Sequence, residues 1–268
     1  MYYKFNIVVI IAHLGEARSL FNLADYEEIS KYPLLSYRKH NRIIVISGEG
    51  RFQAAAAVMH AKGLCEHKII FWLNIGCAGH PSLKLGTVVQ AGKIKDCENG
   101  RSWFPSTPFS KKIPIIEVKS FEKPVNHYEE EICYDMEASG FIELAQKDAI
   151  PEQLVVLKII CDNLMNPVQS FSFREIEACI LSRKNLINTL VEIYSTKAAK
   201  IAKFLKPIEL PWWLRTNKFT HSQRHQVKQL LHSYMIKNKN SHPPMLKIMQ
   251  DKSSREILQE IRHQWKMK

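Results

Sequence analysis

Three short, uninterrupted runs of apolar residues near the start of the chain limit the folds that it can adopt. Residues 5–12 (FNIVVIIA), 42–47 (RIIVIS) and 68–75 (KIIFWLNI) each have the length of one β-strand. They lack the apolar–polar alternation of a strand with one face in water, which indicates strands covered on both faces. Residues 87–91 (TVVQA) and 154–161 (LVVLKIIC) are two further candidate strands.

Stretches with helical character separate these strands. Residues 53–62 (QAAAAVMHAK) are rich in alanine, which allows close packing on a sheet, and residues 136–147 and 172–204 are the other predicted helices. Residues 97–112 carry one glycine and two prolines and are predicted to form a loop. The alternation of buried strands and helices predicts an α/β fold in which helices flank a sheet.

The chain changes character at residues 206–213 (KPIELPWW), where two prolines interrupt the helical pattern. We therefore predict a domain over residues 1–205 and a basic helical C-terminal extension over residues 206–268. Within the extension, Val227, Leu231 and Tyr234 share one helical face, and Ser253 begins a capping box before a second helix. Such apolar stripes are more often packing faces than binding faces.

The extension holds 13 Lys and Arg residues against four acids, a net charge of +9 out of the +12 of the whole chain. A basic segment favours anionic partners such as nucleic acid or an anionic lipid surface. Contact with a partner subunit and a merely solvated basic face are the alternatives that the sequence leaves open.

The spacing of the cysteines and the length of the apolar runs bear on the cellular compartment in which we expect the protein to work. Six cysteines are scattered without paired spacing, which argues against a disulfide framework and against a metal site and fits reduced thiols. The apolar run near the start is too short for a membrane span and is soon followed by Glu16. We expect a cytoplasmic protein.

Polar residues and glycines follow four of the predicted strands. These segments are residues 13–16 (HLGE), 47–51 (SGEGR), 74–79 (NIGCAG) and 161–163 (CDN). Ligands bind at the carboxyl ends of strands in open α/β sheets, and glycines there let a ligand approach the backbone. The chain has neither the GxGxxG spacing of a dinucleotide fold nor a GxxxxGK[ST] phosphate loop.

The order of four segments resembles the purine nucleoside phosphorylase and uridine phosphorylase superfamily. They are SGEGRFQAAAA, NIGCAGHPSLKLGTVV, YDMEASG and KIICDN. The resemblance covers about residues 5–205 and is strongest to methylthioadenosine/S-adenosylhomocysteine nucleosidases, with a further similarity to phosphorylase-like proteins associated with hopanoid synthesis. It implies a single twisted, mostly parallel mixed sheet flanked by helices, and a homo-oligomer, either a dimer or larger.

The resemblance also implies roles in the cleavage of an N-glycosidic bond. Breaking such a bond builds positive charge on the sugar, and a purine leaves more readily when it is protonated. By its place in the motif, Asp162 is implied to be the general acid and Glu137 the acceptor for the ribose hydroxyls. The full set of residues implied to contact the nucleoside is Glu137, Met136, Gly76, Cys77, Ala78, Gly79, Phe104 and Phe121.

The sequence departs from the pattern of the family in two respects. Cys77 and Cys161 stand where hydroxyl residues are common, and the stretch between residues 86 and 135 is shorter than in typical nucleosidases. For Phe104 and Phe121, stacking on the base and simply closing a loop over the core are both open.

Glu16 falls where the nucleosidases keep the glutamate that activates water, so the resemblance favours hydrolysis without a cofactor. The alternative is a phosphorylase that uses inorganic phosphate, for which Arg51 and Gly48 are candidate ligands. A third possibility is a non-catalytic module that senses a nucleoside and binds nucleic acid or a membrane through its extension.

Overall fold

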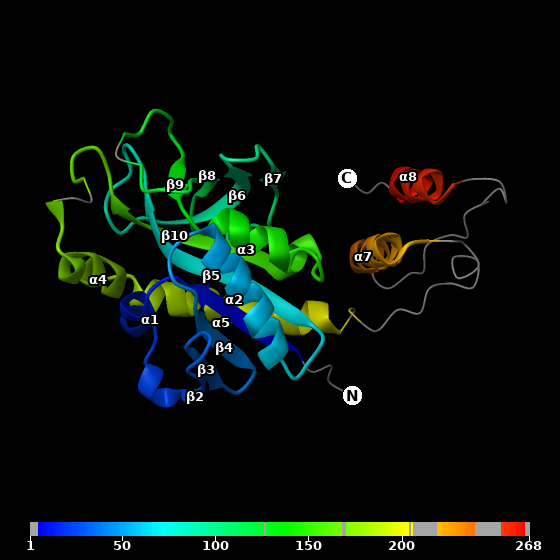
Figure 1. The fold of residues 1–268 in the computed structure, drawn as a ribbon, viewed down its shortest axis with the longest axis horizontal. Coiled ribbons are helices and arrows are strands. Elements are labelled where there is room, and N and C mark those ends of the chain that lie inside the picture. The colour runs from blue at the N-terminus through cyan, green and yellow to red at the C-terminus, as the bar shows by residue number, and fades with distance from the viewer. Residues whose placement is uncertain are drawn as a thin grey trace. The chain divides into compact units, whose positions relative to one another are not determined.

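The computed structural model describes residues 5–125, 127–167, 170–203, 205, 219–238 and 253–265. They form two units, one of residues 5–197 and a second that begins at Ala198. The boundary falls inside a long helix, eight residues before the position expected from the sequence. Figure 1 labels the helices and strands of both units.

A ten-stranded mixed sheet forms the centre of the first unit. Its strands are β1 (Asn6–Ile11), β2 (Glu27–Ser30), β3 (Ser36–Lys39), β4 (Arg42–Ile46), β5 (Ile70–Gly79), β6 (Val88–Asp96), β7 (Ser102–Trp103), β8 (Ile115–Ser120), β9 (Cys133–Asp135) and β10 (Leu154–Asp162). The order is β10-β6-β8-β9-β5-β1-β4-β3-β2, with β7 paired to β6. The five strands predicted from apolar runs are confirmed.

The sheet closes on itself, because β10 pairs with β5 as well as with β6. Strands β5, β10, β6, β8 and β9 thus form a closed barrel, from which β1, β4, β3 and β2 extend as an open sheet. The expectation of a mixed sheet is confirmed, and its longest pairings, such as β10 with β5 and β6 with β8, are parallel. The pairings of β3 with β2 and β4, of β6 with β10 and β7, and of β9 with β5 are antiparallel.

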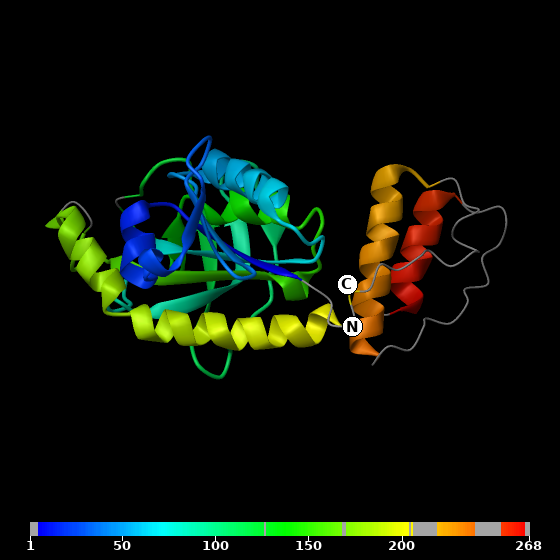
Figure 2. The ribbon, with the colours of Figure 1, turned by 90° about the horizontal axis from the view of Figure 1, so that it is seen from below.

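Helices cover both faces of this sheet (Figure 2). The α-helices of the first unit are α1 (Leu14–Leu20), α2 (Arg51–Leu64), α3 (Ala138–Ala145), α4 (Phe173–Leu181) and α5 (Lys184–Ala202). Two short 3-10 helices, η1 (Leu23–Asp25) and η2 (Pro151–Gln153), complete it. Figure 2 shows α2 and α3 on one side and α5 on the other. The single helix predicted over residues 172–204 is in fact two, because the chain turns at residues 182–183 between α4 and α5.

The packing of β5 explains why its sequence lacks a polar face. Trp72 belongs to the cluster that includes α2 and α3. Its neighbour Phe71 points to the opposite face and meets Tyr194 of α5 edge-on, with ring centroids 6.0 Å apart. Both rings are almost completely buried. The prediction of strands covered on both faces is therefore confirmed.

The described part of the second unit contains two further helices, α7 (His221–Lys237) and α8 (Ser254–Gln264). Each begins with a capping box, at Thr220 and at Ser253. The apolar stripes of the two helices pack on each other, as expected. They form one small cluster of buried residues: Phe219, Val227, Leu231, Ile257, Leu258, Ile261 and Trp265. The proline-containing segment at residues 206–213 lies outside the described residues.

No helix within the described residues has both the length and the apolar character needed to cross a lipid bilayer.

Candidate active site

A cavity of about 220 Å³ opens at the carboxyl ends of β1, β5 and β10. This is the edge of the sheet at which the sequence placed its polar residues and glycines. Its walls come from the loops after β1 and β4, the end of β5, the segment between β8 and α3, and β10. They are formed by Ala12, His13, Glu16, Glu49, Asn74, Ile75, Gly76, Cys77, Ala78, Gly79, Phe121, Lys123, Pro124, Val125, Tyr128, Tyr134, Asp135, Met136, Glu137, Lys158 and Asp162.

Glu16 lies in the first turn of α1 and is buried. One carboxylate oxygen accepts a hydrogen bond from the backbone N–H of His13, and the other accepts one from the N–H of Cys77, both at 3.1 Å. The first contact is local to the helix start, whereas the second joins α1 to the end of β5. The two bonds fix the carboxylate at the cavity wall beside Gly76.

Glu137 stands at the start of α3 and is held by the turn that follows β4. The N–H of Gly50 donates to its Oε1 at 2.9 Å. Gly50 has φ of +93°, a backbone conformation that only glycine adopts easily, so the SGEGR turn is built to present this N–H. Burial raises the pKa of Glu137, while Lys158 and the Gly50 N–H act in the opposite direction.

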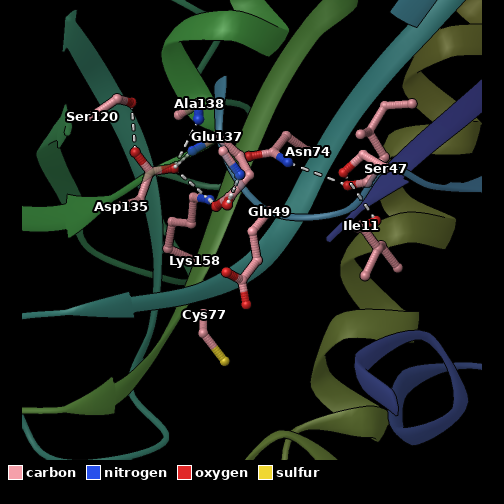
Figure 3. Close-up of polar contacts among 12 residues, drawn as sticks. Ile11, Ser47, Glu49, Asn74, Cys77, Ser120, Asp135, Glu137, Ala138 and Lys158 are labelled. Atoms are coloured by element: carbon pink, nitrogen blue, oxygen red, sulfur yellow. Dashed lines mark hydrogen bonds and ion pairs between the residues drawn. The ribbon is translucent and has the colours of Figure 1, made fainter. Parts of the chain in front are cut away.

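Asp135 and Lys158 form a completely buried ion pair behind Glu137 (Figure 3). The Nζ of Lys158 lies 2.6 Å from Oδ2 of Asp135 and 3.9 Å from Oε2 of Glu137. Asp135 also accepts hydrogen bonds from the Ser120 hydroxyl at 2.6 Å and from the Ala138 N–H at 2.8 Å. Burial acts to lower the pKa of Lys158, but the carboxylates of Asp135, Glu137 and Glu16 outweigh it and raise that pKa.

Asp162 ends β10 and faces the same cavity. Burial raises the pKa of its carboxyl group from 3.8 to about 6. The hydroxyl of Tyr128 donates a hydrogen bond to its Oδ2. A side chain on residue 79 would collide with that hydroxyl, so Gly79 leaves the space in which Tyr128 and Asp162 meet.

Aromatic rings form one wall beside Asp162. Phe121 stacks on Tyr134 with ring centroids 5.4 Å apart and an interplanar angle of 12°. Tyr134 also contacts Tyr128, with a centroid distance of 4.8 Å. Such ring faces can stack on a planar heterocycle.

The cavity therefore brings together most of the residues singled out in the sequence. Glu16, Glu137, Asp162, Met136, Phe121 and the run from Gly76 to Gly79 all line it. The other three do not. Phe104 is 66% exposed and lies outside the lining. Arg51 forms an ion pair with Asp96 at 3.1 Å, and Gly48 serves the turn with a φ of +82°.

The two cysteines that the resemblance puts at positions where hydroxyl residues are common, Cys77 and Cys161, lie on the neighbouring strands β5 and β10. The Sγ atoms of Cys77 and Cys161 are 2.7 Å apart, and all six cysteines of the chain are free thiols. Among the described residues, no three His, Cys, Asp or Glu side chains are grouped so that they could hold a metal ion.

Sequence reasoning missed Lys158, Asp135 and Tyr128. A signal for Lys158 was present, since it is the only charged residue in the otherwise apolar run LVVLKIIC. A lysine there must be paired if the strand is buried on both faces. Asp135 precedes the quoted Met136 and Glu137. Tyr128 lies in a loop with no motif, and only the three-dimensional structure brings it to Asp162.

The fold defined by this barrel and its helices is that of nucleosidases of known structure, as the sequence resemblance implied. The 5′-methylthioadenosine/S-adenosylhomocysteine nucleosidase from Helicobacter pylori, solved with butyl-thio-DADMe-Immucillin-A, is 16% identical with a TM-score of 0.60, and the match covers 72% of this chain and 99% of that one. The futalosine hydrolase of Helicobacter pylori gives 16% identity, a TM-score of 0.58, and coverage of 70% and 97%. The nucleosidase from S. pneumoniae, solved with the transition-state inhibitor MT-ImmA, gives 18% identity, a TM-score of 0.55, and coverage of 68% and 96%.

A search with protein-family models and a search of curated protein sequences each gave no match to the chain.

Proposed function

We propose that this protein hydrolyses the N-glycosidic bond of a purine nucleoside of the adenosine type, with or without a 5′-substituent. The observation that carries the proposal is the gathering of three carboxyl groups, those of Glu16, Glu137 and Asp162, around one cavity at the edge of the sheet. The shared fold with nucleosidases of known structure supports the same conclusion.

Asp162 is proposed to protonate the leaving base. A general acid works best when its pKa lies near the working pH. Burial raises the pKa of Asp162 to about 6, so a usable fraction of the carboxyl group stays protonated near neutral pH. The hydroxyl of Tyr128 now occupies one side of this carboxyl group. A bound purine would take that place and receive the proton.

Glu137 is proposed to accept hydrogen bonds from the ribose hydroxyls. Its Oε1 accepts a hydrogen bond from the Gly50 N–H, which orients the carboxylate at the wall of the cavity. A carboxylate in this place also stabilises the positive charge that develops on the sugar. Met136 would pack against the sugar.

Glu16 is proposed to orient and deprotonate the attacking water. Its two backbone hydrogen bonds fix the carboxylate at the cavity wall, where it is placed to contact a water molecule.

The alternative is a phosphorylase with the same roles for Glu137 and Asp162. It needs cationic ligands for phosphate, and the candidate Arg51 is instead engaged with Asp96 outside the cavity lining. Hydrolysis is therefore favoured, and no cofactor is proposed. A third alternative, a module that only senses a nucleoside, gives no reason for three carboxyl groups to face one cavity.

A panel of adenosine-derived nucleosides, incubated with and without phosphate, tests the proposal. We expect free base to appear without phosphate. Release only in the presence of phosphate, with formation of a sugar 1-phosphate, would establish the phosphorylase. Nucleoside binding without release of base under either condition would leave the sensing module.

We further propose a cytoplasmic homo-oligomer, on the basis of the free thiols and of the family resemblance. The basic extension is proposed to contact nucleic acid, anionic lipid or a partner subunit.

A further inference from the structure

Lys158 is a charged side chain in the most buried part of the sheet. It lies in the middle of β10, between apolar residues that are themselves fully buried, and none of its surface is exposed to solvent. A buried ammonium group is costly unless it is paired. Lys158 therefore needs carboxylate partners inside the fold.

The partners of Lys158 come from the neighbouring elements and surround the cavity floor. Asp135 of β9 is 2.6 Å away and Glu137, at the start of α3, is 3.9 Å away. Glu16 of α1 approaches the same place, since a side chain at Gly76 would touch both the Glu16 carboxylate, at 3.6 Å, and the Lys158 Nζ, at 3.9 Å. One ammonium group thus faces three carboxyl groups.

The other charged groups that line the cavity do not take the place of Lys158 as a buried partner for Glu137. His13 and Glu49 also line the cavity but pair with each other at 2.9 Å. Lys123 lines the cavity from an exposed position. Within the described lining, Lys158 is the only fully buried cation that can balance Glu137.

The three carboxyl groups differ in what else supports them. Asp135 receives hydrogen bonds from Ser120, Ala138 and Glu137, and Glu16 receives two from the backbone. Among the described residues, Glu137 receives one, from Gly50. Glu137 is therefore the carboxylate that depends most on the lysine.

We propose that Lys158 is a positioning residue that keeps Glu137 ionised and directed into the cavity. Its consequence for catalysis rests on the proposed function, in which the ionised Glu137 holds the ribose hydroxyls. Asp135 acts as the anchor that fixes the ammonium group within reach of Glu137.

The test is Lys158→Met, which keeps an unbranched side chain, one heavy atom shorter, and removes its charge. Carboxyl-carbon NMR of glutamate-labelled protein follows the titration of Glu137, whose signal is identified by its loss in Glu137→Gln. We expect the titration midpoint of Glu137 to rise by about one pH unit or more, because an opposite charge at this range shifts a carboxyl group by about that much. Lys93→Met is the matched control, since Lys93 pairs with Glu117 at 3.0 Å outside the cavity lining.

Activity gives a second readout. Losing the lysine raises the pKa of Glu137, and the reaction needs the anion, so the acidic limb of the kcat/KM profile moves to higher pH, toward the limb set by Asp162. Lys158→Arg keeps the charge and is expected to leave the limb in place. A lysine with a merely structural role would lower kcat/KM equally at every pH.

An unmoved Glu137 titration in Lys158→Met would overturn the proposal. If that variant does not fold, the Lys158→Met/Asp135→Asn double variant is compared with Asp135→Asn alone, which isolates the lysine without an unpaired Asp135. The NMR result does not depend on turnover. A shifted titration in a protein that releases no base from any nucleoside would therefore contradict the proposed function and leave the role of Lys158 standing.

Discussion

Asp162 determines how the proposed reaction depends on pH. The reaction needs the protonated carboxyl group, and burial raises its pKa to about 6. We therefore expect kcat/KM to fall as pH rises through about 6. Asp162→Asn should lower kcat by about 10²–10⁴-fold, the usual contribution of general acid catalysis, while nucleoside binding is kept. Rates of base release across pH check this, with the exposed Asp25→Asn as control. A rate unchanged by Asp162→Asn would remove Asp162 from the mechanism.

The same carboxyl group should make the protein less stable at neutral pH. Its pKa is raised in the folded state, so folding favours the protonated form and the stabilisation is lost as pH rises from about 4 through about 6. Asparagine does not ionise and avoids this loss. We expect Asp162→Asn to have a higher Tm than the wild type at pH 7.5 and no such advantage near pH 4. Thermal melts at both pH values measure it, and a gain of equal size at both would contradict the ionisation argument.

How much of the site could be predicted depended on whether a residue belongs to a local pattern. Glu137 and Asp162 sit in short motifs and could be assigned roles from them. Tyr128 and Lys158 act through contacts between segments that are distant in the chain, 34 residues apart for Tyr128 and Asp162. Phe104 is an aromatic residue in a predicted loop, and loop composition alone does not reveal which way its ring points.

At the scale of elements, the contact between α2 and α3 supports the site. Gly140 in α3 packs so closely on the backbone carbonyl of Arg51 that an added methyl group would collide with it. Because backbone cannot move aside as a side chain can, we expect Gly140→Ala to destabilise the protein by about 1–3 kcal/mol. The shift would also move Gly50, whose N–H holds Glu137, so nucleoside binding should weaken.

Thermal melts and nucleoside binding measure the effect of Gly140→Ala. Gly63→Ala in α2 is the matched control, because nothing lies within 4 Å of the methyl group it would add. Alanine favours a helix over glycine by up to about 1 kcal/mol, so this control should be neutral or slightly stabilising. Equal Tm values for the two variants would show that α2 and α3 can separate without cost.

The elements that sequence patterns missed share a physical cause. The short strands β2, β3 and β9 are stabilised by their neighbours rather than by their own apolar character, since β2 is largely exposed and β9 has only three residues. The closed barrel depends on the pairing of β10 with β5, between segments about 80 residues apart. A hydrophobic pattern indicates that a strand is buried, but it does not say which strand lies beside it.

At the scale of the whole molecule, the cavity and the basic extension belong to different parts of the chain. Every residue of the cavity lining lies between Ala12 and Asp162, and α7 and α8 form a cluster of their own. We therefore expect a chain that ends at Lys206 to release base with a kcat/KM within about threefold of the full chain, as for changes made far from a site. The extension carries most of the net positive charge, so salt-dependent binding to single-stranded RNA or to anionic vesicles should be lost with it. Base release and binding at several salt concentrations, measured on both chains, test the two expectations separately.

A large loss of kcat/KM would mean that the extension contributes to the site, and equal binding by both chains would mean that the extension is not the contact for anionic partners.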